Sequence, residues 1–72
     1  MFYYVYILLS PKDNNLYIEF TTNLKNRIKD HNNGRNISTK NRRPLKLIYF
    51  EGYLNKKDTL GREKFLKSGS GH

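Results

Sequence analysis

Charged and titratable side chains interrupt the apolar stripes of both predicted helices. Positions 24, 27, 28 and 31 follow the i, i+3, i+4, i+7 spacing of one helical face, and they hold Leu24, Arg27, Ile28 and His31. Further along, Glu63 stands between two leucines at spacings of three residues. One charge at an apolar boundary is usually a structural ion pair, and one histidine is often a packing residue. Three such side chains with complementary chemistry, each costing free energy without a partner, predict a functional site.

Tyrosines accompany these residues on the strands of a predicted hairpin. The segments Tyr3–Leu9 and Leu16–Phe20 are dense in β-branched and aromatic residues, and turn-forming residues separate them. Because side chains alternate between the two faces of a strand, we expect the aliphatic residues to meet the main core. The opposite face then collects Tyr4, Tyr6, Tyr17 and Glu19. Tyrosines suit half-buried strands in general, so this face points to a site only in combination with the helical charges.

Capping and breaking signals predict the elements that position these residues. Thr22 or Asn23 can cap a first helix over residues 23–33, which Asn33-Gly34 ends. A polar loop over 34–44 leads to a third strand, Leu45–Tyr53. Asn55 can cap a second helix that runs to about Lys67, before Gly69. The order β-β-α-β-α predicts an α+β fold in one domain, residues 1–72, with a small three-stranded antiparallel sheet flanked by helices.

The distribution of charge favours a polyanionic partner. The 72 residues hold 14 Lys+Arg against 6 Asp+Glu, which gives a formal charge of +8. Residues 21–46 carry eight of the bases and one of the acids. Each phosphate that a base neutralises releases counterions, so this stretch suits nucleic acid. A solvated, solubilising face has the same composition, and charge alone does not separate the two.

Several classes of protein are excluded by the same composition. There is no cysteine, which rules out a disulfide framework and a thiolate zinc site. No long amphipathic basic helix is present, so we expect no membrane partner. The apolar run over residues 2–9 has neither a cationic segment before it nor a small-residue cleavage site after it. We therefore expect a cytoplasmic protein, and its oligomeric state is left open.

Taken in order, the motifs of the first half of the chain resemble the GIY-YIG nuclease domain, in particular its small stand-alone bacterial members. Tyr4-Val5-Tyr6 and Tyr17-Ile18-Glu19 stand where that family has its two tripeptides. The segment 21–27 is similar to the start of the family's first helix. Arg27 stands at the family's arginine, and His31 follows one turn later.

The second half continues the resemblance. Residues 40–49 are similar to the family's loop and third strand, and Arg62-Glu63-Lys64 is similar to the segment that carries its metal-binding glutamate. Each motif alone is weak, but the ordered set covers nearly the whole chain. The resemblance implies hydrolysis of nucleic-acid phosphodiester bonds, with DNA as the expected substrate and one divalent ion, Mg²⁺ or Mn²⁺, as cofactor.

The resemblance also implies a role for each site residue. Glu63 would ligate the metal through hard oxygen donors, and Tyr6 or Tyr17 would activate the attacking water. Arg27 would hold a non-bridging phosphate oxygen, and His31 would hydrogen-bond a tyrosine hydroxyl or the water. Four further bases would position the nucleic-acid backbone without reading its sequence: Lys25, Lys40, Arg42 and Arg43.

Glu19 departs from the family pattern, because the second tripeptide ends in glycine. Its carboxylate has three possible consequences: it repels phosphate and crowds the tyrosines, it neutralises Arg27 in a salt bridge, or it adds a metal ligand. The first two would weaken the nuclease. The alternative function is therefore a catalytically inactive nucleic-acid-binding module on the same scaffold. A third hypothesis is a basic module that docks on an acidic protein or on ribosomal RNA.

Overall fold

Three antiparallel strands form a sheet, as predicted, and their order in the sheet is β2-β1-β3. The computed structural model describes residues 1–37 and 39–68. Its elements are β1 (Tyr3–Ser10), β2 (Asn15–Thr21), α1 (Leu24–Asn32), the short 3₁₀ helix η1 (Lys40–Arg42), β3 (Lys46–Tyr53) and α2 (Lys56–Lys67). The 3₁₀ turn interrupts the loop predicted over 34–44. The predicted stop at Gly69 lies outside the described residues, and α2 is capped at Ser68.

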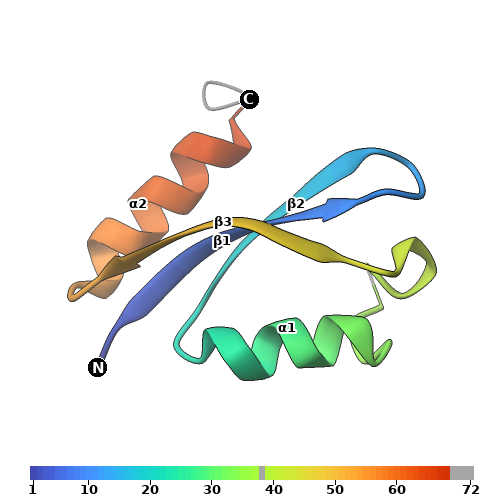
Figure 1. The fold of residues 1–72 in the computed structure, drawn as a ribbon. Helices are drawn as coiled ribbons and strands as arrows, with labels where there is room; N and C mark the ends of the chain where they lie inside the picture. Colours follow the sequence, from blue (N-terminus) through green and yellow to red (C-terminus); the bar gives the residue numbers. More distant parts are fainter. Residues whose placement is uncertain (38, 69–72) are drawn as a thin grey trace.

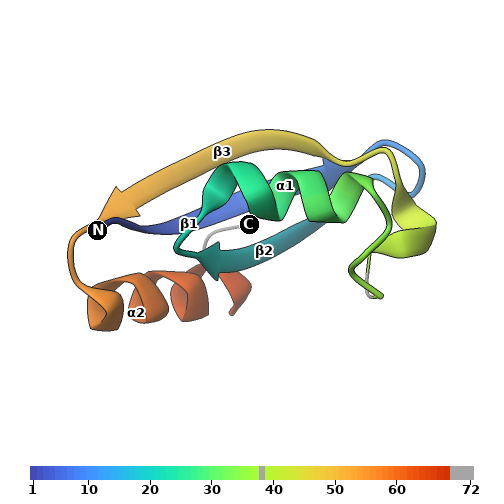
Figure 2. The same ribbon diagram turned by 90° about the horizontal axis from the view of Figure 1, so that it is seen from below.

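The sheet buries both of its faces, and each helix covers one of them (Figure 1). The aliphatic face packs on α2, with Val5, Ile18 and Leu66 at the centre of the contact. The aliphatic face meets a core, as expected, but burial of the opposite face was not predicted. A second core lies beneath α1, where Tyr6 and Leu8 are fully buried. The view from below shows α1 lying across this tyrosine-bearing face (Figure 2).

Asparagine side chains begin both helices, in agreement with the sequence. The Asn23 side chain accepts a hydrogen bond from the Asn26 N–H, and the Asn55 side chain accepts from the N–H groups of Lys57 and Asp58. The predicted stop of α1 is also confirmed, because Gly34 has a φ of +77° just beyond the last turn. Within the described residues, no helix has the length and apolarity needed to cross a membrane.

The connection from α1 to β3 is tied down at both ends. Asn32 and Leu45 exchange two hydrogen bonds, from Asn32 Nδ2 to the Leu45 carbonyl at 3.2 Å and from the Leu45 N–H to Asn32 Oδ1 at 2.9 Å. The buried Ser10 hydroxyl donates to the Arg42 carbonyl at 2.7 Å. These contacts fix the loop beside the last residues of α1 and the last residue of β1.

Candidate active site

A hydrogen-bonded chain links the sheet, α1 and the following loop. Tyr6, His31 and Thr39 are all fully buried. The Tyr6 hydroxyl lies 3.0 Å from His31 Nε2, and His31 Nδ1 lies 2.8 Å from Thr39 Oγ1. Burial, together with the nearby Arg27 charge, lowers the pKa of His31. The imidazole is therefore held in its neutral form at pH 7.

Arg27 approaches the same hydroxyl from one turn earlier on α1. Its positive charge acts on the Tyr6 phenol. Burial is the main reason that the pKa of Tyr6 is raised, although the Arg27 cation works in the opposite direction. Burial disfavours the charged form of Arg27 as well, but the contact with Tyr6 outweighs burial and raises the pKa of Arg27. The phenol is thus neutral at rest, with a permanent cation beside it.

Tyr17 and Glu19 bring a second hydroxyl and a carboxylate to this face. The strand register pairs Tyr6 with Glu19, and Leu8 with Tyr17, so the predicted sharing of one face is confirmed. The Tyr17 ring packs edge-on against His31, with 5.0 Å between the ring centroids. Its hydroxyl donates to Glu19 Oε2 at 3.0 Å. Tyr17 is thereby engaged by the residue that replaces the motif glycine.

Glu63 reaches the site from the opposite layer. Because β2 is an edge strand, the Glu19 side chain passes the edge and meets Glu63 of α2. Burial and the Glu19 carboxylate raise the pKa of Glu63. Burial raises the pKa of Glu19, but its contacts with Glu63 and Tyr17 and the Lys67 charge outweigh burial and lower the pKa overall. Lys67 Nζ lies 3.4 Å from Glu63 and 3.9 Å from Glu19.

The carboxylates fit a divalent cation that takes most of its shell from other sources. Glu63 Oε2 is buried and makes no hydrogen bond to the residues that the structure describes, and its nearest charged partner among them is Lys67 Nζ at 3.4 Å. Across residues 1–37 and 39–68, no group of three acidic, His or Cys side chains could hold a metal. Glu63 is the residue that would hold the ion, and Glu19 lies beside it. Mg²⁺ is commonly held this way, with water and phosphate oxygens completing its octahedron.

No ion pair forms between Glu19 and Arg27, although the sequence allowed one. Both residues instead line an open hollow beside β2, together with Lys56. A cation and an anion therefore face the same solvent-accessible space. Glu19 has its own partners in Tyr17, Glu63 and Lys67, which leaves the Arg27 charge available in this hollow.

The four bases predicted to bind nucleic acid do not form one cluster. Lys25 is exposed in the first turn of α1, whereas Lys40 and Arg43 are exposed beyond the other end of that helix. Arg43 lies over Gly34, where an added Cβ would come within 2.9 Å of its guanidinium. Lys12 lines the same hollow as Lys40 and Arg43, so it joins this basic surface.

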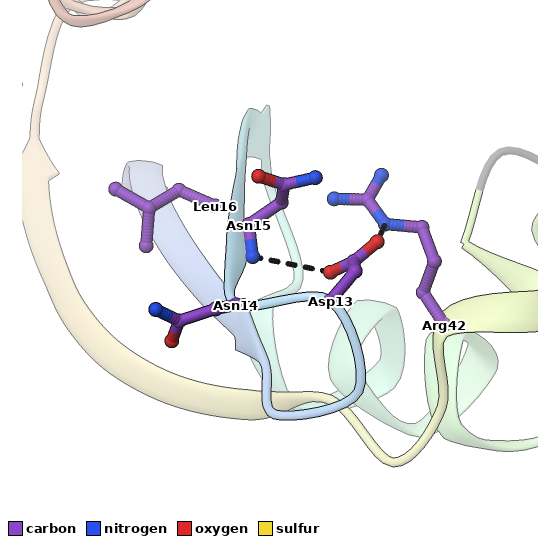
Figure 3. Close-up of a pocket in the computed structure, with 5 residues that line it drawn as sticks. All are labelled: Asp13, Asn14, Asn15, Leu16 and Arg42. Carbon is purple, nitrogen blue, oxygen red and sulfur yellow. Dashed lines mark hydrogen bonds and ion pairs between the residues drawn. The ribbon is translucent and has the colours of Figure 1, made fainter.

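Arg42 is already paired, which the sequence did not indicate. Its Nε lies 3.1 Å from an Asp13 carboxylate oxygen, and the other Asp13 oxygen accepts the Asn15 N–H at 3.1 Å (Figure 3). The backbone hydrogen bond from Asn15, with a smaller contribution from Arg42, lowers the pKa of Asp13. The hollow beside this ion pair is lined by the hairpin turn and by Arg42 of η1, and Arg42 is half-buried.

The structure thus gathers five of the predicted residues and adds two that sequence reasoning missed. Those gathered are Tyr6, Tyr17, Arg27, His31 and Glu63. Thr39 was missed because it lies in a loop, where no periodicity marks a buried position. Lys67 had a signal, since it follows Glu63 by four residues on the same helical face.

Comparison with known proteins agrees with this arrangement. Residues 2–72 match the GIY-YIG catalytic domain. The UPF0213 protein CPE1444 of Clostridium perfringens is 49% identical over 65 residues, which cover 89% of this chain and 69% of that protein. A UPF0213 protein of Staphylococcus haemolyticus, SH2523, is 44% identical over 94% of this chain and 83% of its own length.

A solved structure shares the fold. The solution NMR structure of the UPF0213 protein BH0048 from Bacillus halodurans aligns with a TM-score of 0.59 and 33% identity. The alignment covers 94% of this chain and 72% of that protein. The relatives' names state no activity, but the family match extends over both tripeptide positions, the first helix and the Glu63 segment. The chain therefore belongs to the GIY-YIG catalytic domain family, whose members are generally endonucleases.

Proposed function

We propose that this chain hydrolyses phosphodiester bonds in DNA with the help of a divalent ion, Mg²⁺ or Mn²⁺, and that Glu19 restrains this activity. The observation that carries the proposal is the convergence of two layers on one site. Tyr6 and His31 meet through a hydrogen bond on the α1 face, beside the Arg27 charge. Glu63 joins them at the edge of β2, through contacts with Glu19. Membership of a nuclease family supports the same reaction.

The side chains of this site suit the steps of such a reaction. Tyr6 donates toward His31, which accepts a proton at Nε2 and so turns the phenol into a base for the attacking water. Arg27 stays charged and stabilises the phenolate or a phosphate oxygen in the hollow beside β2. When bound at Glu63, the divalent ion would stabilise negative charge on the leaving oxygen. Of the two tyrosines, Tyr6 is the better candidate for the base because Tyr17 donates to Glu19, but the Tyr6 hydroxyl is buried, so the attacking water must enter from the hollow that Arg27 lines.

The contacts of Glu19 also favour a second candidate function. Its carboxylate holds the Tyr17 hydroxyl and lies beside Glu63, where it repels an incoming phosphate. A chain in which this repulsion abolishes hydrolysis would still present Lys12, Lys40 and Arg43 to a nucleic-acid backbone. It would then act as a nucleic-acid-binding module.

Cleavage assays distinguish these functions. Purified protein is incubated with single-stranded, duplex and branched DNA in the presence of Mg²⁺ or Mn²⁺. We expect cleavage that EDTA abolishes, and that Glu63→Gln and Arg27→Gln each reduce by at least about 100-fold. Tyr6→Phe is expected to remove activity, whereas Tyr17→Phe retains more of it. Salt-dependent binding without cleavage would refute hydrolysis and select the binding module.

A further inference from the structure

The Arg27 charge favours one direction for the chain of contacts that ends at Thr39. Arginine keeps its positive charge and carries only donors, and this charge acts on both Tyr6 and His31. The phenol has one hydrogen, and His31 Nε2 lies 3.0 Å from it. If Nε2 donated to the phenol, the buried Tyr6 O–H would lack an acceptor, and if the phenol donates to Nε2, the buried Thr39 O–H lacks one in the described part of the chain. The Arg27 charge decides between the two directions, because it disfavours a proton on Nε2 and favours a Tyr6 O–H that points toward Nε2.

The protonation of Nδ1, the other imidazole nitrogen, follows from this direction. A neutral imidazole has one donor nitrogen and one acceptor nitrogen. With Nε2 accepting from Tyr6, Nδ1 carries the hydrogen and donates to Thr39 Oγ1, 2.8 Å away. Thr39 is fully buried and therefore has no water to replace this contact.

We propose that Thr39 is a positioning residue: it holds His31 in the tautomer protonated on Nδ1, which leaves Nε2 to accept the Tyr6 proton. Free histidine in water favours the opposite tautomer, so the protein must supply the preference. The loop is suited to this task because it is anchored on both sides. Asn32 ties it to Leu45, and the Thr39 carbonyl accepts the Arg42 N–H at 2.9 Å. The catalytic consequence rests on the function proposed above, but the tautomer itself does not.

Nitrogen NMR measures the tautomer directly and requires no activity. The full chain is labelled with ¹⁵N-histidine, and the signals of His31 are identified by comparison with a His72→Gln variant. At pH 7.5 we expect His31 Nδ1 to resonate as a protonated nitrogen and Nε2 as an unprotonated one. A wild-type protein whose His31 is protonated on Nε2 would overturn the proposal, whatever the variants do.

Two substitutions isolate the hydroxyl. Thr39→Ser keeps the acceptor and should keep the Nδ1-protonated form. Thr39→Val has nearly the same shape without the hydroxyl, so the Nε2-protonated form should become populated while dispersed amide signals show that the fold persists. An unchanged tautomer in a folded Thr39→Val protein would refute the role of Thr39. If that variant does not fold, the wild-type and Thr39→Ser spectra decide the question.

Cleavage kinetics connect the tautomer to the reaction. Thr39→Val should lower kcat by about tenfold with KM unchanged, whereas Thr39→Ser should keep kcat near the wild-type value. A tenfold loss is part of the roughly 100-fold or larger contribution that a positioned proton acceptor makes to the rate. Equal kcat values for the three proteins would exclude a role in the reaction. An absence of cleavage in wild type and in the variants would refute the proposed function, while the NMR result would still decide the tautomer.

Discussion

The carboxylate of Glu19 should slow hydrolysis chiefly through its charge. Glu19 Oε2 lies 3.0 Å from the Tyr17 hydroxyl oxygen. That hydroxyl gives its one hydrogen to Glu19, so a phosphate oxygen would meet the phenol only in van der Waals contact, about 5 Å from the carboxylate. Two unit charges at that separation repel by about 3.3 kcal/mol at an effective dielectric of about 20, and by about 0.8 kcal/mol in bulk water. These energies correspond to about 250-fold and about 4-fold in rate.

Two substitutions separate the charge from the contact with Tyr17. Glu19→Gln removes the charge and keeps an acceptor for the tyrosine, whereas Glu19→Gly removes both. We expect kcat/KM for metal-dependent DNA cleavage to rise by about 4- to 250-fold in Glu19→Gln, and further in Glu19→Gly because Tyr17 is released. Thermal unfolding should accompany the assay, since a glycine within a strand costs about 0.5–1 kcal/mol.

Asp58→Asn is the matched control. Asp58 is exposed in the first turn of α2, so this variant has the same net charge as Glu19→Gln without a change at the site. A gain common to both variants would reflect general attraction of DNA to a more basic protein. Rates for Glu19→Gln and Glu19→Gly that do not exceed the Asp58→Asn rate would refute the proposed restraint.

The pH, a helix cap and the basic loop give three further predictions. Because the pKa of His31 lies below its usual value of 6.5, the unfolded chain takes up a proton at this residue at a higher pH than the folded chain does. The free energy of unfolding, measured by urea titration, should therefore fall between pH 7.5 and 5.5. His31→Gln should flatten this trend, and equal slopes in the two proteins would exclude His31 as its cause. Asn55→Ala should cost about 1 kcal/mol of unfolding free energy, and an unchanged urea midpoint would show that the cap is dispensable. In DNA-binding titrations, Lys40→Gln and Arg43→Gln should each reduce the slope of log K against log salt by about 0.9. Arg42→Gln should reduce the slope less, because Arg42 is paired with Asp13, and equal effects of the three substitutions would contradict that ion pair.

The strands and the tyrosine-bearing face were predictable from the sequence. Two-residue alternation assigns each strand residue to a face, and the antiparallel register then places Tyr6 opposite Glu19. The caps of both helices were equally visible, because an asparagine side chain satisfies N–H groups that the helix leaves open. Each of these signals is local, and so it can be read without knowledge of the fold.

The relation between the two layers was not predictable in the same way. Helical periodicity identifies the apolar side of α1 or α2, but it does not say which face of the sheet that side covers. Burial of the second face was therefore not predicted. The α1 stripe packs on the sheet through Leu24 and Ile28, but in the α2 stripe Leu66 is buried whereas Leu60 is exposed. Arg42 and Asp13 illustrate the same limit, because both lie outside regular strands and α-helices and their pairing depends on how the hairpin turn meets η1.

The position of Glu19 on an edge strand explains why the fold accepts a carboxylate in place of the motif glycine. On a central strand, such a side chain would be confined to one face of the sheet. At the edge of β2 it finds a donor in Tyr17 and a cation in Lys67, so its charge is compensated before any ligand binds. These partners belong to the same site that would bind phosphate and metal. What stabilises Glu19 in the folded protein therefore opposes catalysis, and restoring glycine should raise activity while it lowers the free energy of unfolding.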